Sequence, residues 1–294
     1  MGAIDEEVIT IESLLEQGPE LSSLPEVYLR VTELLDDSCA TVYEIGEAVQ
    51  TDPAISTRIL TMVNSAYYGM PHRISTISQA TALLGRDRIK QILIGSVLVN
   101  LFADPEIESF SLKDFWLHSI KTAIIAKQLA IQSGDVSDSD ALFIAGLLHD
   151  TGSLVLADKV PLLFDRVYHL RRKLGLLAAE REVLGFDHSE LGEALMTRWG
   201  LPELLVTCTG HHHDSGYNST YASSVRLVYM ANELSHHLPP LDEGEALELL
   251  RDIDNWQLAG IKVDQICLAC QLAEEQVFDV MESLGMINMV VRGE

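Results

Sequence analysis

Positive charge is scarce in this chain of 294 residues, which has 20 lysines and arginines against 44 aspartates and glutamates. The formal net charge of −24 at pH 7 argues against partners that are bound through clustered basic residues. Nucleic-acid phosphates are the main partners of this kind. The short basic stretches RDRIK (86–90) and RRK (171–173) are typical of solvated helix faces. We therefore expect no nucleic-acid partner.

Cysteine and long apolar runs are also scarce. The four cysteines are too few for a disulfide scaffold. Cys267 and Cys270 form a CxxC, but the surrounding residues 263–284 have a helical pattern, which favours two small core residues over a redox or zinc pair. No apolar run reaches the roughly 18 residues of a membrane span, and the start MGAIDEEVIT is acidic, unlike a targeting leader. We expect a cytoplasmic protein without membrane contact.

Strand patterns are missing as well, because no stretch alternates apolar and polar residues with a period of two. Apolar residues instead recur every three or four positions, as in LPEVYLRVTELLDD (24–37) and TDPAISTRILTMVNSA (51–66). The second of these opens with Asp52 as an N-cap and Pro53 at the first helical position. The sequence therefore predicts an all-α protein.

Histidine, in contrast, is plentiful, and several of the ten histidines fall where a helix turns inward. Asp114 and His118 are four residues apart, so they share one face of a helix predicted over 112–133. The same face carries Ile125 and Leu129, which indicates that it points to a core. A single inward histidine is typical of a hydrogen-bonded core residue, and Asp114 alone would be a sufficient partner.

His149 and Asp150 end the apolar run ALFIAGLL (141–148). A histidine near the C-terminus of a helix is favoured by the helix dipole, and Gly152 is a plausible helix breaker. A carboxylate at that end is electrostatically disfavoured, so Asp150 does not fit a simple polar helix end. A bound cation would remove this conflict.

Two further histidine sites follow along the chain. His188 lies in the first turn of a predicted helix, where the dipole favours the neutral imidazole that ligates metals, although a solvated surface histidine fits equally well. GHHHDSGY (210–217) gathers three imidazoles and a carboxylate between two predicted helices. Imidazole with carboxylate suits zinc, iron, manganese or nickel. Together these features predict a site for one or two divalent metal ions.

The order of these residues, His, then His-Asp, then later histidines, resembles the HD superfamily of helical metal-dependent phosphohydrolases. The segments SLPEV (23–27), TDPAISTRILTMVNSAYYG (51–69) and ISTISQATALLG (74–85) resemble a narrower group, the HDOD family, which is the HD-related output domain of bacterial signalling proteins. AGLLHDTGSLVLA (145–157) and LGFDHSELGEALMTRWGLPE (184–203) continue the similarity, which covers approximately residues 14–235.

The resemblance implies two packed helical lobes, with an N-terminal lobe over 1–105, an HD-like bundle over 106–238 and a helical extension over 239–294. Similarity to the HD-GYP relatives, which cleave cyclic di-GMP, implies the metal ligands Asp114, His118, His149, Asp150, His188, His212 and His213. Asp214 stands where an acidic residue usually follows the His pair. Tyr217 lies in SGYN (215–218), a shortened form of the GYP segment, and is expected to contact a ligand.

Two positions depart from the hydrolase pattern. Asn232 stands where the superfamily places its last metal-binding aspartate, and its neutral amide is a weaker ligand for a divalent ion. Ser153 stands where a lysine usually holds substrate phosphate. Loss of that cation removes electrostatic stabilisation of a transferring phosphoryl group. These departures predict binding without efficient catalysis.

Three functions follow as hypotheses. HDOD proteins are mostly regarded as regulatory, so the resemblance implies a non-catalytic module that contacts signalling proteins and is tuned by metal or nucleotide in the HD cleft. The alternative is a metal-dependent phosphodiesterase with a cyclic dinucleotide substrate, in which two metals bridged by Asp150 activate a water. In the third hypothesis the site is a relic, and its histidines are simply hydrogen-bonded to carboxylates.

Overall fold

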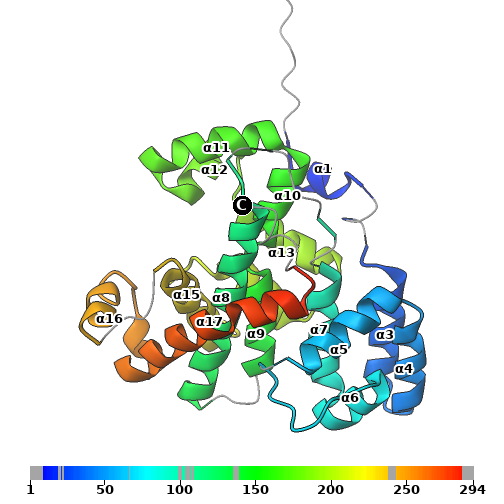
Figure 1. Ribbon diagram of the computed structural model, residues 1–294. Coiled ribbons are helices and arrows are strands. Elements are labelled where there is room, and N and C mark those ends of the chain that lie inside the picture. The colour runs from blue at the N-terminus through cyan, green and yellow to red at the C-terminus, as the bar shows by residue number, and fades with distance from the viewer. Residues whose placement is uncertain are drawn as a thin grey trace, which may run out of the picture.

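The computed structural model describes residues 9–18, 21, 23–65, 67–98, 101–102, 107, 109–134, 139–237 and 243–286. These residues form α-helices and one short 3-10 helix, and no strand occurs among them. The helices gather into two lobes that pack against each other (Figure 1). The predicted all-α fold with two packed lobes is therefore confirmed. The boundaries predicted after residues 105 and 238 lie outside the described residues.

The N-terminal lobe, blue to cyan in Figure 1, contains α3 (Glu26–Asp36), α4 (Val42–Gln50), α5 (Pro53–Val63), α6 (Ile77–Leu84) and α7 (Arg86–Leu98). The short α1 (Ile11–Leu15) precedes these helices and packs against α13 (His188–Arg198) of the second lobe. Local signals start these helices. The Asp52 carboxylate accepts hydrogen bonds from the backbone N–H groups of Ala54 (2.9 Å) and Ile55 (3.0 Å), and Pro53 takes the first position of α5. The predicted cap of this helix is therefore present.

The NSAYYG segment after α5 connects the lobes. The Asn64 side chain donates to the carbonyl of Ile74 at 2.8 Å and accepts from the backbone N–H of the same residue at 2.7 Å, which fixes the following loop. The Tyr67 ring lies 5.1 Å from that of Phe143, and the Lys127 ammonium lies 4.5 Å from the Tyr67 ring. Since Lys127 and Phe143 belong to the second lobe, Tyr67 serves inter-lobe packing.

The basic stretch 86–90 is used within the fold. The Arg86 guanidinium donates to four backbone carbonyls at and beyond the end of α3, those of Leu34, Leu35, Asp37 and Ala40. Arg88 pairs with Asp140 at 2.5 Å, and Lys90 pairs with Asp36 at 2.6 Å. These cations are therefore bonded to acidic and carbonyl groups of the chain itself.

The second lobe contains α8 (Leu112–Ser133), α9 (Ser139–Leu148), α10 (Thr151–Lys159), α11 (Pro161–Leu174), α12 (Leu176–Leu184), α13 (His188–Arg198), α14 (Glu203–His211) and α15 (Ala222–Ser235). α8 is its central helix and packs against α9 and α15. α8 and α9 approach closely because residue 146 is glycine: a β-carbon there would lie 2.7 Å from the Ala123 Cα. This contact brings the end of α9 toward the middle of α8.

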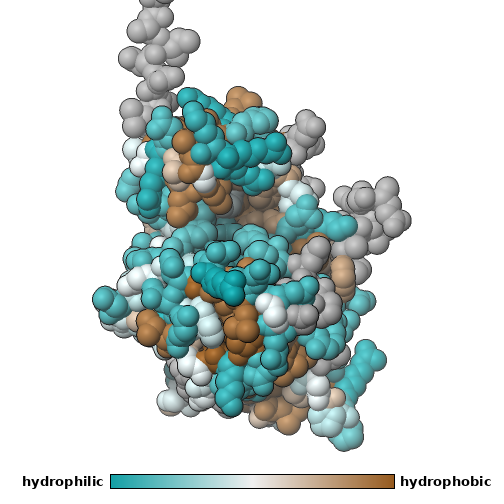
Figure 2. All heavy atoms as spheres, turned by 90° about the vertical axis from the view of Figure 1, so that its left-hand side faces the viewer, coloured by the Kyte–Doolittle hydropathy of each residue, from teal (hydrophilic) through white to brown (hydrophobic). Residues whose placement is uncertain are grey.

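The α11–α12 hairpin projects from the body of the second lobe (Figure 1). It forms the upper part of the face in Figure 2, where hydrophobic side chains lie among hydrophilic ones. Its exposed leucines include Leu162, which is 85% exposed, with Leu174 and Leu176 at the turn between the helices. Single exposed leucines of this kind are normal on protein surfaces.

The C-terminal part consists of α16 (Glu243–Leu249), the 3-10 helix η1 (Trp256–Ala259) and α17 (Val263–Ser283). α17 lies along α8 and also reaches α5, so it contacts both lobes (Figure 1). The CxxC is part of this packed helix, with Cys270 buried and Cys267 half-buried. This placement agrees with the expectation that they are small core residues.

One stretch of the described chain, Ser139–Lys159, has the length and composition of a membrane span. It covers α9 and α10, and 78% of its most apolar window is buried inside the protein. The sequence shows no uninterrupted apolar run here, because His149 and Asp150 divide the apolar residues. Burial in the core of the second lobe accounts for the apolar character of this stretch.

Candidate metal centre

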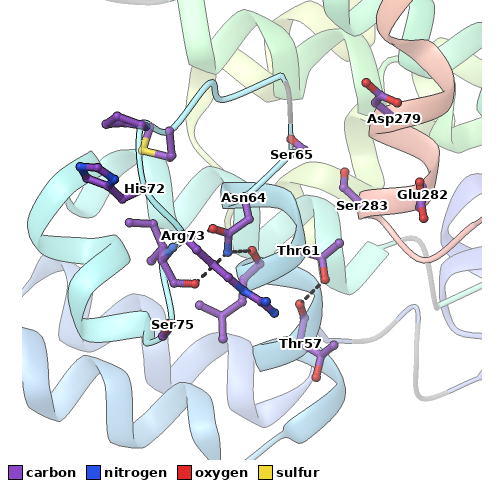
Figure 3. A pocket seen from close by; sticks show the side chains of 14 residues that line it. Thr57, Thr61, Asn64, Ser65, His72, Arg73, Ser75, Asp279, Glu282 and Ser283 are labelled. Carbon is purple, nitrogen blue, oxygen red and sulfur yellow. Dashed lines mark hydrogen bonds between the residues drawn. The ribbon is translucent and has the colours of Figure 1, made fainter.

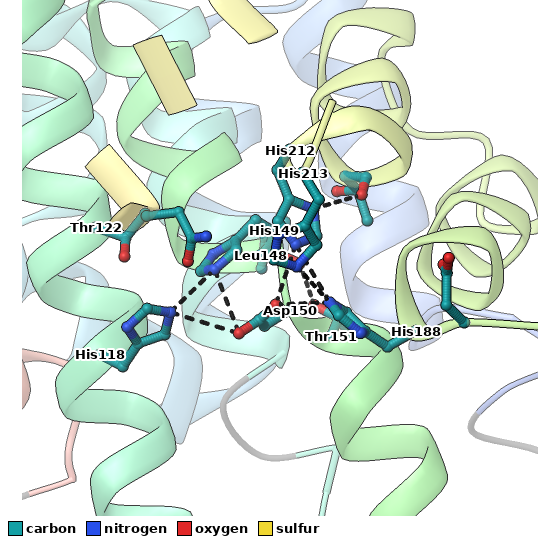
Figure 4. Close-up of polar contacts among 12 residues, drawn as sticks. His118, Thr122, Leu148, His149, Asp150, Thr151, His188, His212 and His213 are labelled. Carbon is teal, nitrogen blue, oxygen red and sulfur yellow. Dashed lines mark hydrogen bonds and ion pairs between the residues drawn. The ribbon is translucent and has the colours of Figure 1, made fainter. Parts of the chain in front are cut away.

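Six predicted ligand residues meet in the second lobe (Figure 4). One comes from the second turn of α8, two from the turn between α9 and α10, one from the first position of α13, and two from the residues directly after α14. In that order they are His118, His149 and Asp150, His188, and His212 and His213. Segments almost a hundred residues apart in the sequence therefore contribute to one cluster.

The cluster divides into two groups that share Asp150. The four-donor group consists of Asp150, His188, His212 and His213, and the three-donor group consists of His118, His149 and Asp150. Within each group the donor atoms lie within 4.8 Å of one another. Each oxygen of the Asp150 carboxylate faces one group.

The distances show how the carboxylate is shared. Oδ1 of Asp150 lies 3.3 Å from Nε2 of His188 and 3.2 Å from Nε2 of His212. Oδ2 lies 3.3 Å from Nε2 of His149 and 3.5 Å from Nε2 of His118. A bridging carboxylate between two sets of imidazoles is an arrangement that suits a pair of metal ions.

The second nitrogen of each ring determines its tautomer. Nδ1 of His149 lies 2.7 Å from the carbonyl oxygen of Gly146, and Nδ1 of His212 lies 2.7 Å from that of Thr209. A carbonyl oxygen only accepts, so Nδ1 carries the hydrogen in both rings. A neutral imidazole has a single N–H. The Nε2 atoms that face Asp150 are therefore lone-pair donors.

In His118, a serine hydroxyl fixes the same tautomer, with the hydrogen on Nδ1. Ser235 donates its hydrogen to the carbonyl of Asn232 at 2.7 Å, so its oxygen is left to accept from Nδ1–H of His118 at 2.9 Å. Nε2 of His118 then also presents a lone pair to the cluster. Asn232, expected as an auxiliary ligand, thus acts through its backbone on the hydroxyl that orients His118.

His188 is oriented by a residue that the sequence analysis missed. Glu180 on α12 is fully buried, and its Oε2 accepts from both Nδ1 of His188 (2.7 Å) and the His188 backbone N–H (3.0 Å). A carboxylate behind a ligating histidine fixes the ring and raises its basicity. Within the sequence, Glu180 looked like any solvated acid of a charged helix, so no local signal could have identified it.

The converging lone pairs constitute the main chemical feature of the cluster. Neighbouring Nε2 atoms are 3.2 Å apart in the three-donor group and 3.1 to 3.3 Å apart in the four-donor group. These atoms also face a carboxylate, and acceptors that face acceptors repel one another unless a proton or a cation lies between them. The residues therefore fit a divalent ion, which can lie between several of these atoms at once, whereas a ring proton lies between only two of them.

Asp150 remains ionised in this environment. Burial alone would raise its pKa, but the surrounding imidazoles of His149, His118 and His188 hold the pKa well below its usual range. An ionised carboxylate is the form that bridges metals.

The histidines of the four-donor group differ in their proton affinity. Burial lowers the pKa of His212 to about 4, and burial together with His212 lowers the pKa of His213 even further. Burial also disfavours charge on His188, but the Glu180 carboxylate outweighs it and raises the pKa of His188 well above its ordinary value. Without metal, His188 is thus the ring that holds a proton, and metal binding would displace it.

The structure does not bring Asp114 into either group. Its side chain is exposed in the first turn of α8, where its backbone N–H bonds the Ser111 hydroxyl at 3.2 Å. Although Asp114 and His118 are one helical turn apart, only His118 reaches the cluster. Asp214 is also exposed, and its Oδ1 accepts from the Gly216 N–H at 2.9 Å, so it closes a turn.

The two residues expected to contact a ligand lie beside the cluster. The Tyr217 ring stacks on His211, with 4.3 Å between ring centroids, and His211 belongs to neither group. Ser153 is half-buried, and its backbone N–H bonds the Asp150 carbonyl at 2.8 Å in the first turn of α10. It presents no positive charge there.

Gly152 has a role other than the one expected from the sequence. A β-carbon at this position would lie 1.9 Å from the His188 carbonyl oxygen, so the start of α10 touches the start of α13 directly. This contact holds His188 next to Asp150. A glycine two residues after Asp150 is therefore required by packing, whereas its expected role as a helix breaker is wrong, because Gly152 is the second residue of α10.

A cavity of about 1020 Å³ lies away from the metal centre (Figure 3). It is open to solvent and is lined by α5, the loop after NSAYYG and the end of α17. Its polar lining includes Arg73 on the loop, Asn64 after α5, and Asp279 and Glu282 on α17. None of the His/Asp cluster lines it, so the two features are separate.

Comparison with known proteins places this geometry in a family. The family model of the HDOD domain matches residues 21–215. An uncharacterized protein of Treponema pallidum (strain Nichols) is 26% identical over 206 residues, and the match covers 69% of this chain and 39% of that relative. The chain thus spans about two fifths of the length of the curated relative it matches.

Two solved structures share the fold over almost the whole chain. One is named as a candidate phosphohydrolase from Shewanella amazonensis and has a TM-score of 0.76 at 23% identity. The match covers 93% of this chain and 97% of the Shewanella chain. The other, an HDOD domain protein of unknown function from Geobacter sulfurreducens, has a TM-score of 0.69 at 24% identity and covers 93% and 95%. With the family match over residues 21–215, the chain belongs to the HDOD domain family.

Proposed function

We propose that this chain is a metal-binding regulatory domain of bacterial signal transduction that works in the cytoplasm. Its HD cleft would hold one or two divalent ions, of iron, manganese, zinc or nickel, through Asp150 and the histidines of the two groups. The single observation that carries the metal is the convergence of unprotonated Nε2 atoms on an ionised carboxylate. The domain acts by contact with other signalling proteins, with a nucleotide as a further ligand of the cleft.

Two residues support a non-catalytic role. Ser153 occupies the first turn beside Asp150, where it offers no cation to stabilise a transferring phosphoryl group. Asn232 is buried, and its side-chain amide donates to the Glu233 carboxylate at 3.2 Å. A neutral amide engaged in this way adds no charge to offset a metal ion.

A metal-dependent phosphodiesterase is the second candidate function. The sharing of the two Asp150 oxygens between the two groups favours it, since a pair of bridged ions can activate a water and stabilise both oxygens of an in-line displacement. A cyclic dinucleotide is the substrate class that this candidate implies. Ser153 and Asn232 weigh against efficient turnover.

Metal analysis tests the proposal. We expect the purified protein to hold up to two equivalents of a divalent transition metal, and a His149→Ala/Asp150→Ala variant to hold none. Asp150→Asn, which keeps the side-chain shape, controls for misfolding and should also lose metal while its circular dichroism is unchanged. A parent protein that takes up no metal after incubation with each of the four ions would leave the hydrogen-bonded relic as the explanation.

Activity assays separate the two functions. The metal-loaded protein is incubated with cyclic di-GMP and with a generic aryl phosphodiester. We expect no turnover of either. Turnover that is present in the parent and absent from the double variant would establish the phosphodiesterase and overturn the regulatory proposal.

A further inference from the structure

The two groups differ in how completely the chain surrounds an ion. The four-donor group has enough protein donors for the tetrahedral set of a closed transition-metal site. The three-donor group lacks one. Asn232, the residue expected nearby, is bonded to Glu233 and serves the Ser235 hydroxyl through its carbonyl. One further protein donor would give the second site the same four-ligand set.

His236 lies next to the incomplete group. It follows α15 as its C-cap, one helical turn after Asn232, and its side chain is exposed. Its ring stacks on His118, with 4.4 Å between centroids and 14° between the planes. Among the described residues, His236 has no hydrogen bond from its ring nitrogens, whereas His118 has one that fixes its orientation.

We infer that His236 is the fourth donor of the three-donor group and binds the ion held by His118, His149 and Asp150. The inference rests on the proposed function, because it requires a metal at this group. An exposed side chain at a helix end can change rotamer at small cost, so the ring can turn from the stack onto the ion. The stack keeps this imidazole beside the site until the metal arrives.

The consequence is a pair of sites with different exchange behaviour. In the four-donor group, His188 and His212 are fully buried and held by Glu180 and the Thr209 carbonyl. In the other group, the fourth donor would come from an exposed residue at the end of α15. The ion completed by His236 is therefore the exchangeable one, and its release frees the ring without disturbing the buried site.

Cobalt titration of the chelator-stripped protein tests the inference, because the absorption of Co²⁺ reports both the number of bound ions and the ligands around each. His236→Phe keeps an aromatic ring for the stack and removes the nitrogen donor, whereas His236→Ala removes both. His237→Phe is the matched control, since His237 is the exposed neighbour. Thermal unfolding in chelator checks that all variants fold alike.

We expect two equivalents of Co²⁺ in the parent and in His237→Phe. Both His236 variants should keep the first equivalent and bind the second at least about tenfold more weakly, the lower end of the loss seen when even an outer partner of a metal ligand is removed. If His236→Phe binds like the parent, the ring only stacks and the inference is overturned, whatever His236→Ala does. A parent that binds no Co²⁺ contradicts the proposed function itself.

Discussion

Replacement of Gly152 by alanine tests how helix packing builds the four-donor group. The added β-carbon would lie 1.9 Å from the carbonyl oxygen of His188 and 3.0 Å from the backbone nitrogen of Gly192. Both neighbours are backbone atoms of α13, so no side chain can turn away. Since contacts below 3.0 Å essentially never occur for a real β-carbon, α10 and α13 must separate by about 1 Å.

This displacement is small for a helix but large for a metal site. Overpacking of this kind costs about 1–3 kcal/mol of unfolding free energy. Metal–ligand distances tolerate only about 0.2 Å, so moving His188 by about 1 Å should empty the four-donor group. The three-donor group shares Asp150 with this site but takes its two imidazoles from α8 and the end of α9, so it should lose less affinity.

Elemental analysis and urea unfolding in chelator measure the two effects. We expect Gly152→Ala to hold one metal equivalent fewer than the parent and to unfold at lower urea. Gly216→Ala is the matched control, because its β-carbon would meet only the Asp214 carboxylate at 3.4 Å, an ordinary contact. A Gly152→Ala protein with full metal content and unchanged stability would refute the packing argument.

Three further predictions concern single groups. Glu180→Gln should weaken metal binding by about 10–100-fold in competition with a chelator, since it removes the charge behind a ligating imidazole. In the metal-free folded protein the pKa of His212 is lowered from 6.5 to about 4, so the unfolded chain takes up a proton on His212 at a higher pH than the folded protein does. The melting temperature should therefore fall as the pH drops through this window. The fall should be smaller in His212→Gln. A thiol reagent at pH 8 should modify exposed Cys39 first, because Cys208 and Cys270 are buried with pKa values raised to about 12.

The local parts of this structure could be predicted because they depend on neighbours in the sequence. The capping box of α13 is an example: Asp187 accepts from the Glu190 N–H at 3.0 Å, and Glu190 accepts from the Asp187 N–H at 2.9 Å, as their spacing indicates. The helical class follows from the apolar periodicity in the same way. The kinds of ligand were also visible, since histidines and an aspartate interrupt apolar helices.

The outer partners of the ligands were not visible, because they come from other helices. Glu180 precedes His188 by eight residues, and the turn between α12 and α13 brings its carboxylate behind the imidazole. Asp114 was expected at the cluster but lies away from it. It is four residues before His118 on α8, yet its carboxylate belongs to neither donor group. Helical spacing defines a shared face but does not decide how far each side chain is from a third helix.

The sequence by itself determined the all-α class, the helix starts and the residues able to hold a metal, since these depend on periodicity, capping and side-chain chemistry. Only the tertiary structure decided that one carboxylate, that of Asp150, faces two sets of imidazoles. That arrangement depends on Gly146, which lets α8 and α9 approach, and on Gly152, which lets α10 touch α13. Contacts between helices distant in the chain, set by the absence of a β-carbon, bring the donors within reach of one another.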